Sequence, residues 1–184
     1  ADSTPLAKVR VTTASGADAS DDVFTIYGTP VEQGGWLAQV TGTTLALWDV
    51  AGSGEDRAWA AGDDGTIVAT LDGGDTWAKQ KTGVLNDLRG VDFLDGAFGY
   101  AVGLSGRILR TKDGGASWAR LSSGATLALN GIDVVDATRA AAAGREGIFR
   151  TADGGATWKH QTSGLTDAIW LRDVDFVSPQ RGWV

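Results

Sequence analysis

The sequence contains no cysteine and no methionine, and among its 184 residues there are only three prolines and one histidine, His160. The lack of cysteine excludes disulfides and thiolate metal sites. With a single histidine, a Ser/His/Asp triad or a zinc site would depend on that residue alone. No apolar run approaches the length of a membrane-spanning helix, so we expect no direct insertion into a membrane.

Positive charge is also scarce, because 16 Lys and Arg face 23 Asp and Glu, giving a net charge of −7. A chain of this charge attracts nucleic acid poorly, and we do not expect a nucleic-acid partner. The first residues, Ala1-Asp2-Ser3-Thr4-Pro5, look like a mature end left after removal of a signal peptide. The expectation is therefore an exported protein, in a periplasm, a lumen or the extracellular space.

Glycine is abundant, with 27 residues spread along the chain, as expected for many tight turns between short strands. One eight-residue phrase recurs three times at spacings of 41 and 40 residues, as TLDGGDTW (70–77), TKDGGASW (111–118) and TADGGATW (151–158). Each unit holds four short strand-like runs, and no window shows helical periodicity. This pattern predicts an all-β β-propeller of four-stranded antiparallel blades, about 41 residues each.

The repeat register divides the chain into an N-terminal tail and one propeller domain over 6–184. The first unit is degenerate, with Val31 where the others have Asp, and the last stops in its second strand. We expect the intact protein to be larger. The predicted ranges are 1–5 for the tail, 6–42, 47–83, 88–124 and 129–164 for four blades, and 171–184 for part of a fifth.

The recurring phrase resembles the Asp box, or bacterial neuraminidase repeat, of sialidases, sortilin-type receptors and xyloglucan-cleaving hydrolases. The fuller unit adds a Gly-Tyr-Ala-Val-Gly strand at 99–103 and a Gly-Arg-Ile-Leu-Arg-Thr strand at 106–111. In this form it is similar to the photosystem II stability and assembly factor family. The resemblance covers about 44–184 and implies a propeller, typically seven-bladed, that is exported and acts as an assembly or docking scaffold.

Residues of the repeated phrase have a structural explanation. Glycine permits positive φ, a short Asp side chain accepts nearby backbone amides, and a Trp buries a large face against a neighbouring blade. A catalytic carboxylate is needed once, whereas a fold-making one recurs. We therefore assign structural roles to Asp72, Trp77, Asp113, Trp118, Asp153 and Trp158.

Three further acids, Asp92, Asp133 and Asp175, recur in the first strand of successive blades. We predict a solvated polar position; a ring of carboxylates that binds a cation is the alternative. We assign no cofactor, no metal site and no catalytic residue. His160 is expected at an exposed position of an outer strand.

Two of the eight tryptophans, Trp48 and Trp170, fall outside the repeat positions and precede the first strand of their blades. Aromatic side chains on a rim anchor protein partners or sugars, although they can also simply cover a blade edge. Arg89 and Arg172 belong to the same region. We expect Arg57, Arg139 and Arg181 to join them in a basic cluster.

The sequence thus predicts a non-catalytic scaffold that docks a protein partner through a rim that includes Trp48, Arg89, Trp170 and Arg172. Assembly or stabilisation of a membrane or envelope complex is the role that we expect for it. One alternative is a sialidase- or xyloglucanase-like glycoside hydrolase, for which a glycan would be the ligand. Its candidate acids are Glu32, Glu55, Glu146, Asp21-Asp22 and Asp63-Asp64. The other alternative is a structural subunit of a surface layer or filament.

Overall fold

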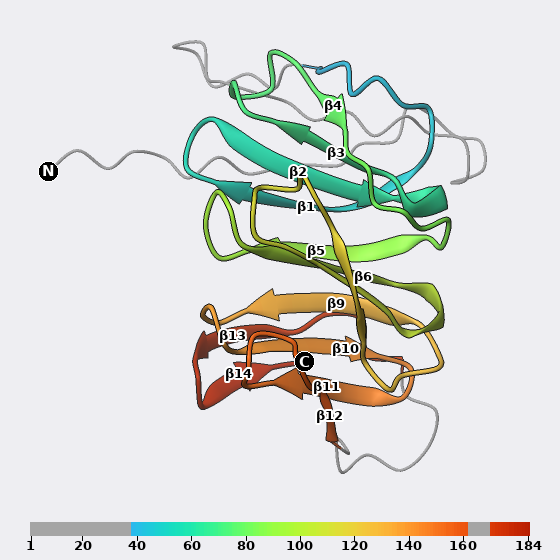
Figure 1. Ribbon diagram of the computed structural model, residues 1–184, viewed down its shortest axis with the longest axis vertical. Helices are drawn as coiled ribbons and strands as arrows, with labels where there is room; N and C mark the ends of the chain where they lie inside the picture. Colours follow the sequence, from blue (N-terminus) through green and yellow to red (C-terminus); the bar gives the residue numbers. More distant parts are fainter. Residues whose placement is uncertain (1–37, 162–169) are drawn as a thin grey trace, which may run out of the picture.

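A computed structural model of the chain describes residues 38–161 and 170–184 as a succession of β-sheets, one sheet per repeat (Figure 1). The predicted tail and nearly all of the first predicted blade lie outside the described residues. So does the end of the fourth predicted blade, from residue 162.

Three four-stranded antiparallel sheets follow one another along the chain, each with its strands in sequence order. The first sheet has β1 (Leu47–Ser53), β2 (Arg57–Gly62), β3 (Ile67–Thr70) and β4 (Ala78–Lys79). The second has β5 (Leu88–Phe93), β6 (Gly99–Gly103), β7 (Arg107–Thr111) and β8 (Ala119–Ser122). The third has β9 (Leu129–Val134), β10 (Ala140–Gly144), β11 (Gly147–Thr151) and β12 (Lys159–Gln161).

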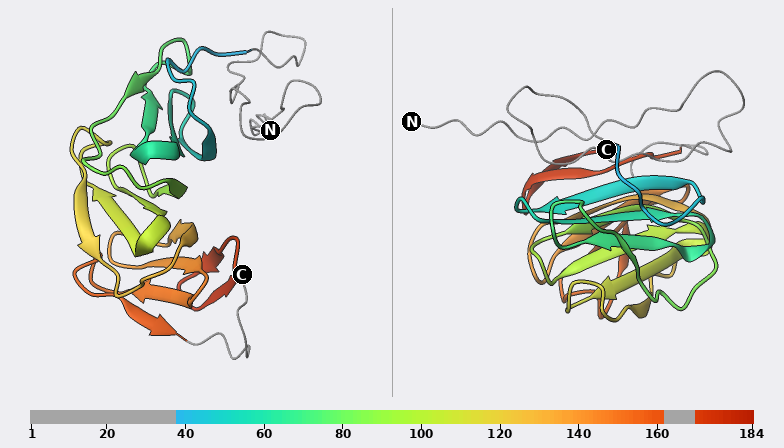
Figure 2. Two further views of the ribbon diagram at one scale, coloured as in Figure 1. Left: turned by 90° about the vertical axis from the view of Figure 1, so that its right-hand side faces the viewer. Right: turned by 90° about the horizontal axis from the view of Figure 1, so that it is seen from above.

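A two-stranded hairpin of β13 (Asp175–Ser178) and β14 (Arg181–Trp183) begins the next blade. The sheets fan out around a common centre and so form an arc (Figure 2). The first strands β1, β5 and β9 pack side by side on the inner edge of this arc. These features confirm the predicted propeller architecture of four-stranded antiparallel blades.

In each four-stranded blade the two middle strands are mostly buried and the outermost strand is the least buried. All five residues of β6 and of β10 are buried, whereas the outermost strands β4 and β12 are exposed throughout. Small residues fill the middle strands, as in the Ala140–Gly144 run, because neighbouring sheets approach them from both faces. Blades therefore hold together mainly through their inner halves.

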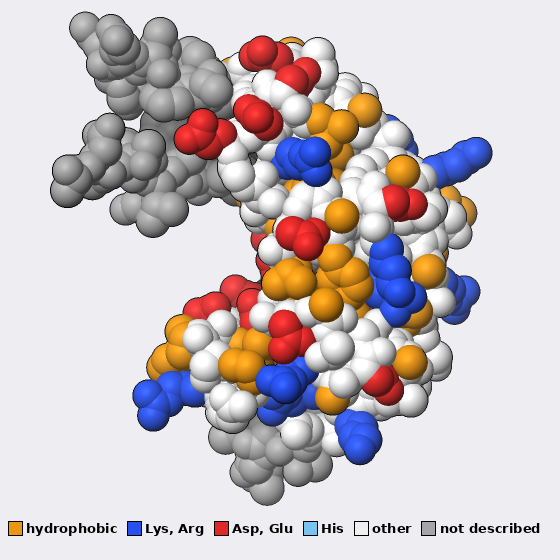
Figure 3. Space-filling model, turned by 60° about the vertical axis from the view of Figure 1, so that its left-hand side comes forward, with side chains coloured by type: hydrophobic (Ala, Val, Ile, Leu, Met, Phe, Trp, Pro, Cys, Tyr) orange, Lys and Arg blue, Asp and Glu red, His pale blue; other side chains and the backbone are white. Residues whose placement is uncertain are grey.

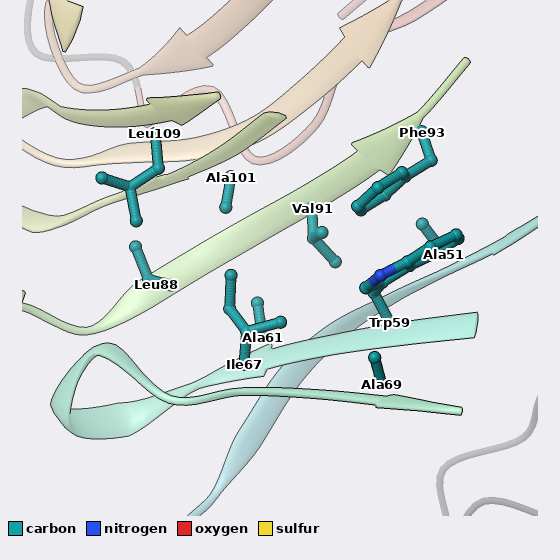
Figure 4. Close-up of a cluster of buried hydrophobic side chains, with 10 residues drawn as sticks. All are labelled: Ala51, Trp59, Ala61, Ile67, Ala69, Leu88, Val91, Phe93, Ala101 and Leu109. Carbon is teal, nitrogen blue, oxygen red and sulfur yellow. The ribbon is translucent and has the colours of Figure 1, made fainter. Parts of the chain in front are cut away.

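The cores lie between blades rather than within one sheet. Between the first two sheets, Trp59, Ile67, Leu88, Phe93 and Leu109 form the centre of a buried cluster (Figure 4). An equivalent cluster around Tyr100, Leu129 and Phe149 joins the second and third sheets. Each blade thus buries its apolar face only against its neighbour, as expected for a repeat protein.

The turn between the second and third strands accounts for the unequal repeat spacing. In the second sheet Gly103 and Arg107 are separated by three residues, and Gly106 among them has φ +64°. A Cβ atom at Gly106 would lie 2.0 Å from the carbonyl oxygen of Ala125, so only glycine fits. In the third sheet two residues separate Gly144 from Gly147, and this shorter turn makes the repeat 40 residues long instead of 41.

Candidate functional site

The repeated Asp-Gly-Gly turn joins the third and fourth strands of each blade and closes on itself through side chains. Asp72 Oδ1 accepts the backbone N–H of Thr76 at 2.9 Å, and Asp72 Oδ2 accepts the Thr76 hydroxyl at 2.6 Å. The buried Thr70 hydroxyl donates to Asp72 Oδ1 at 2.7 Å and accepts the N–H of Gly74 at 2.8 Å. Asp113 and Asp153 make the same bonds in the next two turns.

These hydrogen bonds favour the charged carboxylate. The side-chain bond from Thr76, followed by its backbone bond, lowers the pKa of Asp72 to about 2. The pKa values of Asp113 and Asp153 fall to about 2 for the same reason, with Ser117 and Thr157 as donors. An acid held fully ionised by its own turn cannot supply a proton at neutral pH, which argues against a general-acid role.

The tryptophan that ends each turn meets the preceding blade. Trp77 and Trp118 donate their indole N–H to the side-chain oxygens of Gln39 and Gln80, at 3.0 Å in each case. The indole nitrogen of Trp158 is buried without a hydrogen-bond partner, because Leu121 occupies the place of the two glutamines.

Trp48 lies where β1 begins and is 48% exposed. Its indole N–H donates to Asp63 Oδ1 at 2.6 Å. The guanidinium of Arg89, from the start of β5 in the next blade, lies over the ring at 4.4 Å from its centroid. Arg89 also pairs with Asp87, with N and O 3.7 Å apart. The structure thus brings the predicted residues Trp48 and Arg89 together across a blade junction.

Trp170 forms the second aromatic–cation group and is 52% exposed. Arg145 lies over its ring at 4.3 Å and Arg172 at 5.7 Å. Trp170 and Arg172 were predicted from the sequence, whereas Arg145, which lies in the β10–β11 turn, was not. The other repeats have no arginine at the position that corresponds to Arg145, so the repeat pattern gave no signal for this residue.

Both groups lie on one rim of the arc, where the first strands begin. We call this the tryptophan rim and define it by Trp48, Arg89, Arg145, Trp170 and Arg172. Antiparallel pairing places the starts of the second strands at the other end, since Ser53 pairs with Arg57 and Leu47 with Gly62. The rim that carries these starts and the Asp-Gly-Gly turns is called the turn rim, and it faces forward in Figure 3.

The predicted single arginine cluster is therefore wrong. Arg57 begins β2 on the turn rim, Arg139 directly precedes β10 there, and Arg181 begins β14 at the same end. Arg57 donates to the carbonyl of Gly96, and Arg139 pairs with Asp136 at 3.7 Å. Strand direction, which alternates within a blade, separates residues that the repeat register had grouped.

The inner strands carry acids that the analysis expected in solvent. Asp92 and Asp133 are instead half-buried, while Asp175 is exposed. Burial raises the pKa of Asp133 to about 6, helped by the charges of Asp92 and Asp175, and burial likewise raises the pKa of Asp92. In the described part of the chain, no group of three or more His, Cys, Asp or Glu side chains is placed to hold a metal ion.

Of the remaining candidates for catalysis, only His160 and Glu146 meet among the described residues, where His160 Nε2 contacts the backbone carbonyl of Glu146. His160 is exposed on β12, as expected, and its ring stacks on Phe149 with centroids 4.8 Å apart. Glu146 is held by the backbone and hydroxyl of Thr126, at 2.7 and 2.6 Å. Gly124, Glu146, Phe149 and His160 line one pocket. Glu32 and Asp21-Asp22 lie outside the described residues, whereas Asp63 is engaged by Trp48.

Residues 28–170 match the model of the family described as Photosynthesis system II assembly factor YCF48. The solved structure of YCF48 bound to D1 peptide is 29% identical, with a TM-score of 0.57 over 64% of this chain and 40% of that one. YCF48 from Cyanidioschyzon merolae is 25% identical, with a TM-score of 0.56 over 72% of this chain and 38% of that one. The chain thus spans about two fifths of the length of these relatives.

A more distant similarity connects the chain to glycoside hydrolases. The GH74 xyloglucanase from Xanthomonas campestris is 12% identical, with a TM-score of 0.54 over 71% of this chain and 26% of that one. At this identity the likeness concerns the fold alone. A search of the curated proteins finds no match. The described residues include no helix of the length and apolarity needed to cross a membrane.

The family match covers more than three quarters of the chain and agrees with the propeller architecture and with both YCF48 structures. The chain belongs to the photosynthesis system II assembly factor YCF48 family.

Proposed function

We propose that this chain is part of an exported, non-catalytic scaffold that docks a protein partner through its tryptophan rim. The observation that carries the proposal is the repetition of one arrangement. Two half-exposed tryptophans, Trp48 and Trp170, each lie under a guanidinium donated by another segment of the chain. Interface hot spots are enriched in Trp and Arg, which supply large contact area together with directed hydrogen bonds.

The surface between the two tryptophans suits a peptide with both apolar and acidic groups. Leu85 and Leu127 are exposed in the connections that lead into β5 and β9. They belong to the same end of the blades as Trp48 and Trp170. Arg89, Arg145 and Arg172 add positive charge there, although the whole chain carries −7. Such a surface would attract carboxylate side chains locally and bury apolar ones beside them.

The family supports a protein as the partner. The solved YCF48 relative is bound to a D1 peptide, which makes that peptide a suitable first probe for this chain. Assembly or stabilisation of a membrane or envelope complex remains part of the proposal. Export rests on the family resemblance. The glycoside-hydrolase and surface-layer hypotheses stay predictions, and no contact among the described residues favours either one.

The experiment measures binding of a fluorescently labelled D1 peptide to the purified chain by fluorescence anisotropy. The rim variant combines Trp48→Ala, Trp170→Ala and Arg172→Ala. The matched control combines Arg57→Ala and Arg139→Ala on the turn rim. We expect the rim variant to weaken binding at least about tenfold, as loss of hot-spot residues does, and the control to bind like the wild type.

The result is interpretable only if both variants fold. Urea unfolding, monitored by tryptophan fluorescence, establishes this. Equal loss of affinity in the rim variant and the control would overturn the assignment to the tryptophan rim. If the wild type does not bind the D1 peptide, the tagged chain is purified from its native envelope fraction. A stoichiometric partner that the rim variant fails to retain would then support docking, and a bait recovered alone would contradict it.

A further inference from the structure

Carboxylates on the innermost strands bridge successive blades. Asp49 Oδ2 on β1 accepts the backbone N–H of Val91 on β5 at 2.8 Å. Asp92 Oδ2 on β5 accepts the backbone N–H of Val134 on β9 at 2.6 Å. The other oxygen of each carboxylate accepts the N–H of the following residue, Val50 or Phe93, at 2.8 Å. Each side chain thus ties its own strand to the next blade.

The bridges form part of a larger set of acids on the inner edge of the arc. We call this set, which comprises Asp49, Asp92, Asp133, Asp173 and Asp175, the inner carboxyl column. Acidic side chains are visible at this inner edge, in the hollow of the molecule (Figure 3). Asp133 continues the pattern toward the backbone of Phe176, and its Oδ2 atom is buried without a partner. Asp49, Asp92 and Asp133 are half-buried, so their charges lie where desolvation makes charge costly, and the exposed Asp173 and Asp175 add like charge beside them.

The charged groups around the column do not neutralise it. Asp49 is acted on by Asp173 and Asp92, and Asp92 by Asp173 and Asp175. Asp133 is acted on by Asp92, Asp175 and Asp173.

The arginines of the neighbouring strands bind elsewhere. Arg57 donates to Gly96, Arg89 lies over Trp48, Arg150 donates to Pro179, Arg172 lies over Trp170, and Arg181 is exposed at the start of β14. Neither of the two ion pairs found within 38–161 and 170–184 includes a member of the column.

We propose that the inner carboxyl column is a proton-sensitive seam, which strengthens the junctions between blades when it takes up protons in mildly acid solution. A protonated carboxyl keeps a carbonyl oxygen that can accept the bridging amide, while the repulsion between blades is removed. The seam acts on the stability of the arc and goes beyond the docking of a partner on the tryptophan rim.

The direction of the effect follows from linkage between protons and folding. Burial, followed by the charges of Asp173 and Asp92, raises the pKa of Asp49 from 3.8 to about 6 against the opposing bonds from Val91 and Val50. Folding therefore binds protons between these two values, and stability rises as pH falls through 6 toward 4. Each carboxyl whose pKa is raised to about 6 lowers the unfolding equilibrium constant by about tenfold between pH 7 and pH 5.

The test is urea unfolding of the full chain at pH 5, 6 and 7, followed by tryptophan fluorescence. The variants are Asp49→Asn and Asp133→Asn, and the matched control is Asp75→Asn at an exposed turn position. We expect the wild type and the control to have an unfolding constant at least about tenfold smaller at pH 5 than at pH 7. Each column variant should lose about tenfold of that difference.

A wild type whose stability is flat or falls between pH 7 and pH 5 would overturn the proposal, as would column variants that keep the full pH dependence. Should a variant not fold, the carboxyl carbons of the wild type are titrated by NMR. Midpoints near 6 for Asp49 and Asp133 support the seam, and midpoints near 4 contradict it.

Discussion

The indole of Trp59 lies flat on the ring of Phe93, with ring centroids 3.6 Å apart and planes 8° from parallel. The two residues belong to neighbouring blades, and both are buried. The Trp59 N–H reaches further along the same junction and donates to the carbonyl of Gly114 at 2.9 Å. Trp59 therefore joins the middle of its own blade to Phe93 on the first strand of the next blade (Figure 4), and it also bonds to the Asp-Gly-Gly turn of that blade.

Replacing Trp59 tests how much this junction contributes to the free energy of unfolding. Trp59→Ala should lower the free energy of unfolding by about 3–5 kcal/mol, because a fully buried large aromatic is removed and a cavity remains. Trp59→Phe keeps a ring against Phe93 but loses the N–H, and its loss should be clearly smaller. Urea unfolding monitored by circular dichroism measures both. A cost below about 1 kcal/mol for Trp59→Ala would show that the junction depends on other contacts.

Two of the repeats have glutamine at a position where the third has leucine, and exchanging these residues should change stability in opposite directions. Gln80→Leu removes the acceptor of the Trp118 indole and should cost about 1–3 kcal/mol, the range for a buried donor left unpaired. Leu121→Gln places the same acceptor beside Trp158, whose N–H has none, and should add about 1 kcal/mol. Thermal unfolding of the two variants compares them directly. Destabilisation by Leu121→Gln would mean that the apolar packing of Leu121 outweighs the hydrogen bond.

The buried threonine before each Asp-Gly-Gly turn should matter more than its size suggests. Thr111 is almost fully buried, and its hydroxyl accepts the N–H of Gly115 at 2.8 Å. Thr111→Val keeps the shape but leaves that amide unpaired, with an expected cost of about 1–3 kcal/mol. The exposed Thr44→Val should change stability by less than about 0.5 kcal/mol. The midpoints of urea unfolding, compared at an unchanged m-value, measure both effects. Equal losses of stability in Thr111→Val and Thr44→Val would contradict the role of the hydroxyl.

The turn acids predict a loss of stability in strong acid. Hydrogen bonds from Thr76, Ser117 and Thr157 lower the pKa values of Asp72, Asp113 and Asp153 to about 2 in the folded state, below the ordinary 3.8. Their contribution is present above 3.8 and is lost as pH falls through the folded values near 2. Stability measured between pH 4 and pH 2 should fall for the wild type.

A triple variant, in which all three turn acids are replaced by asparagine, should be less stable at neutral pH. Its free energy of unfolding should also fall less steeply between pH 4 and pH 2. Asp75→Asn, one residue before Thr76, is the control and should keep the wild-type slope. If the stability of the triple variant falls as steeply as that of the wild type, other carboxyls cause the loss of stability between pH 4 and pH 2. This window lies below that of the inner carboxyl column, so the two sets of acids are separable in one titration.

The repeated turn was predictable because its bonds are local. Asp72 and Thr76 are four residues apart, and Thr70 and Asp72 are two apart. A contact of this kind is made by one segment alone, so the same residues in the same order produce the same turn three times. Strand number, strand order and the propeller architecture follow from that repetition, since each unit can bury its apolar face only against another unit.

Contacts between repeats could not be predicted in this way. Arg89 lies over Trp48 across 41 residues, and Asp49 reaches Val91 across 42, although neither pair shares a local motif. The sequence register placed Arg57 with Arg89, but antiparallel strand direction puts them on opposite rims. The acids of the inner strands looked solvated for the same reason: alternation within a strand does not show how closely the next blade approaches.

The sequence by itself determined the blade, the turn and the family resemblance, because these depend on short-range bonding and on a repeated pattern of burial. Only the tertiary structure decided which arginines cover Trp48 and Trp170, where charge is desolvated, and which indole lacks a partner. These properties depend on the packing of one blade against the next, and a single substitution such as Leu121 for glutamine changes them without disturbing the repeat.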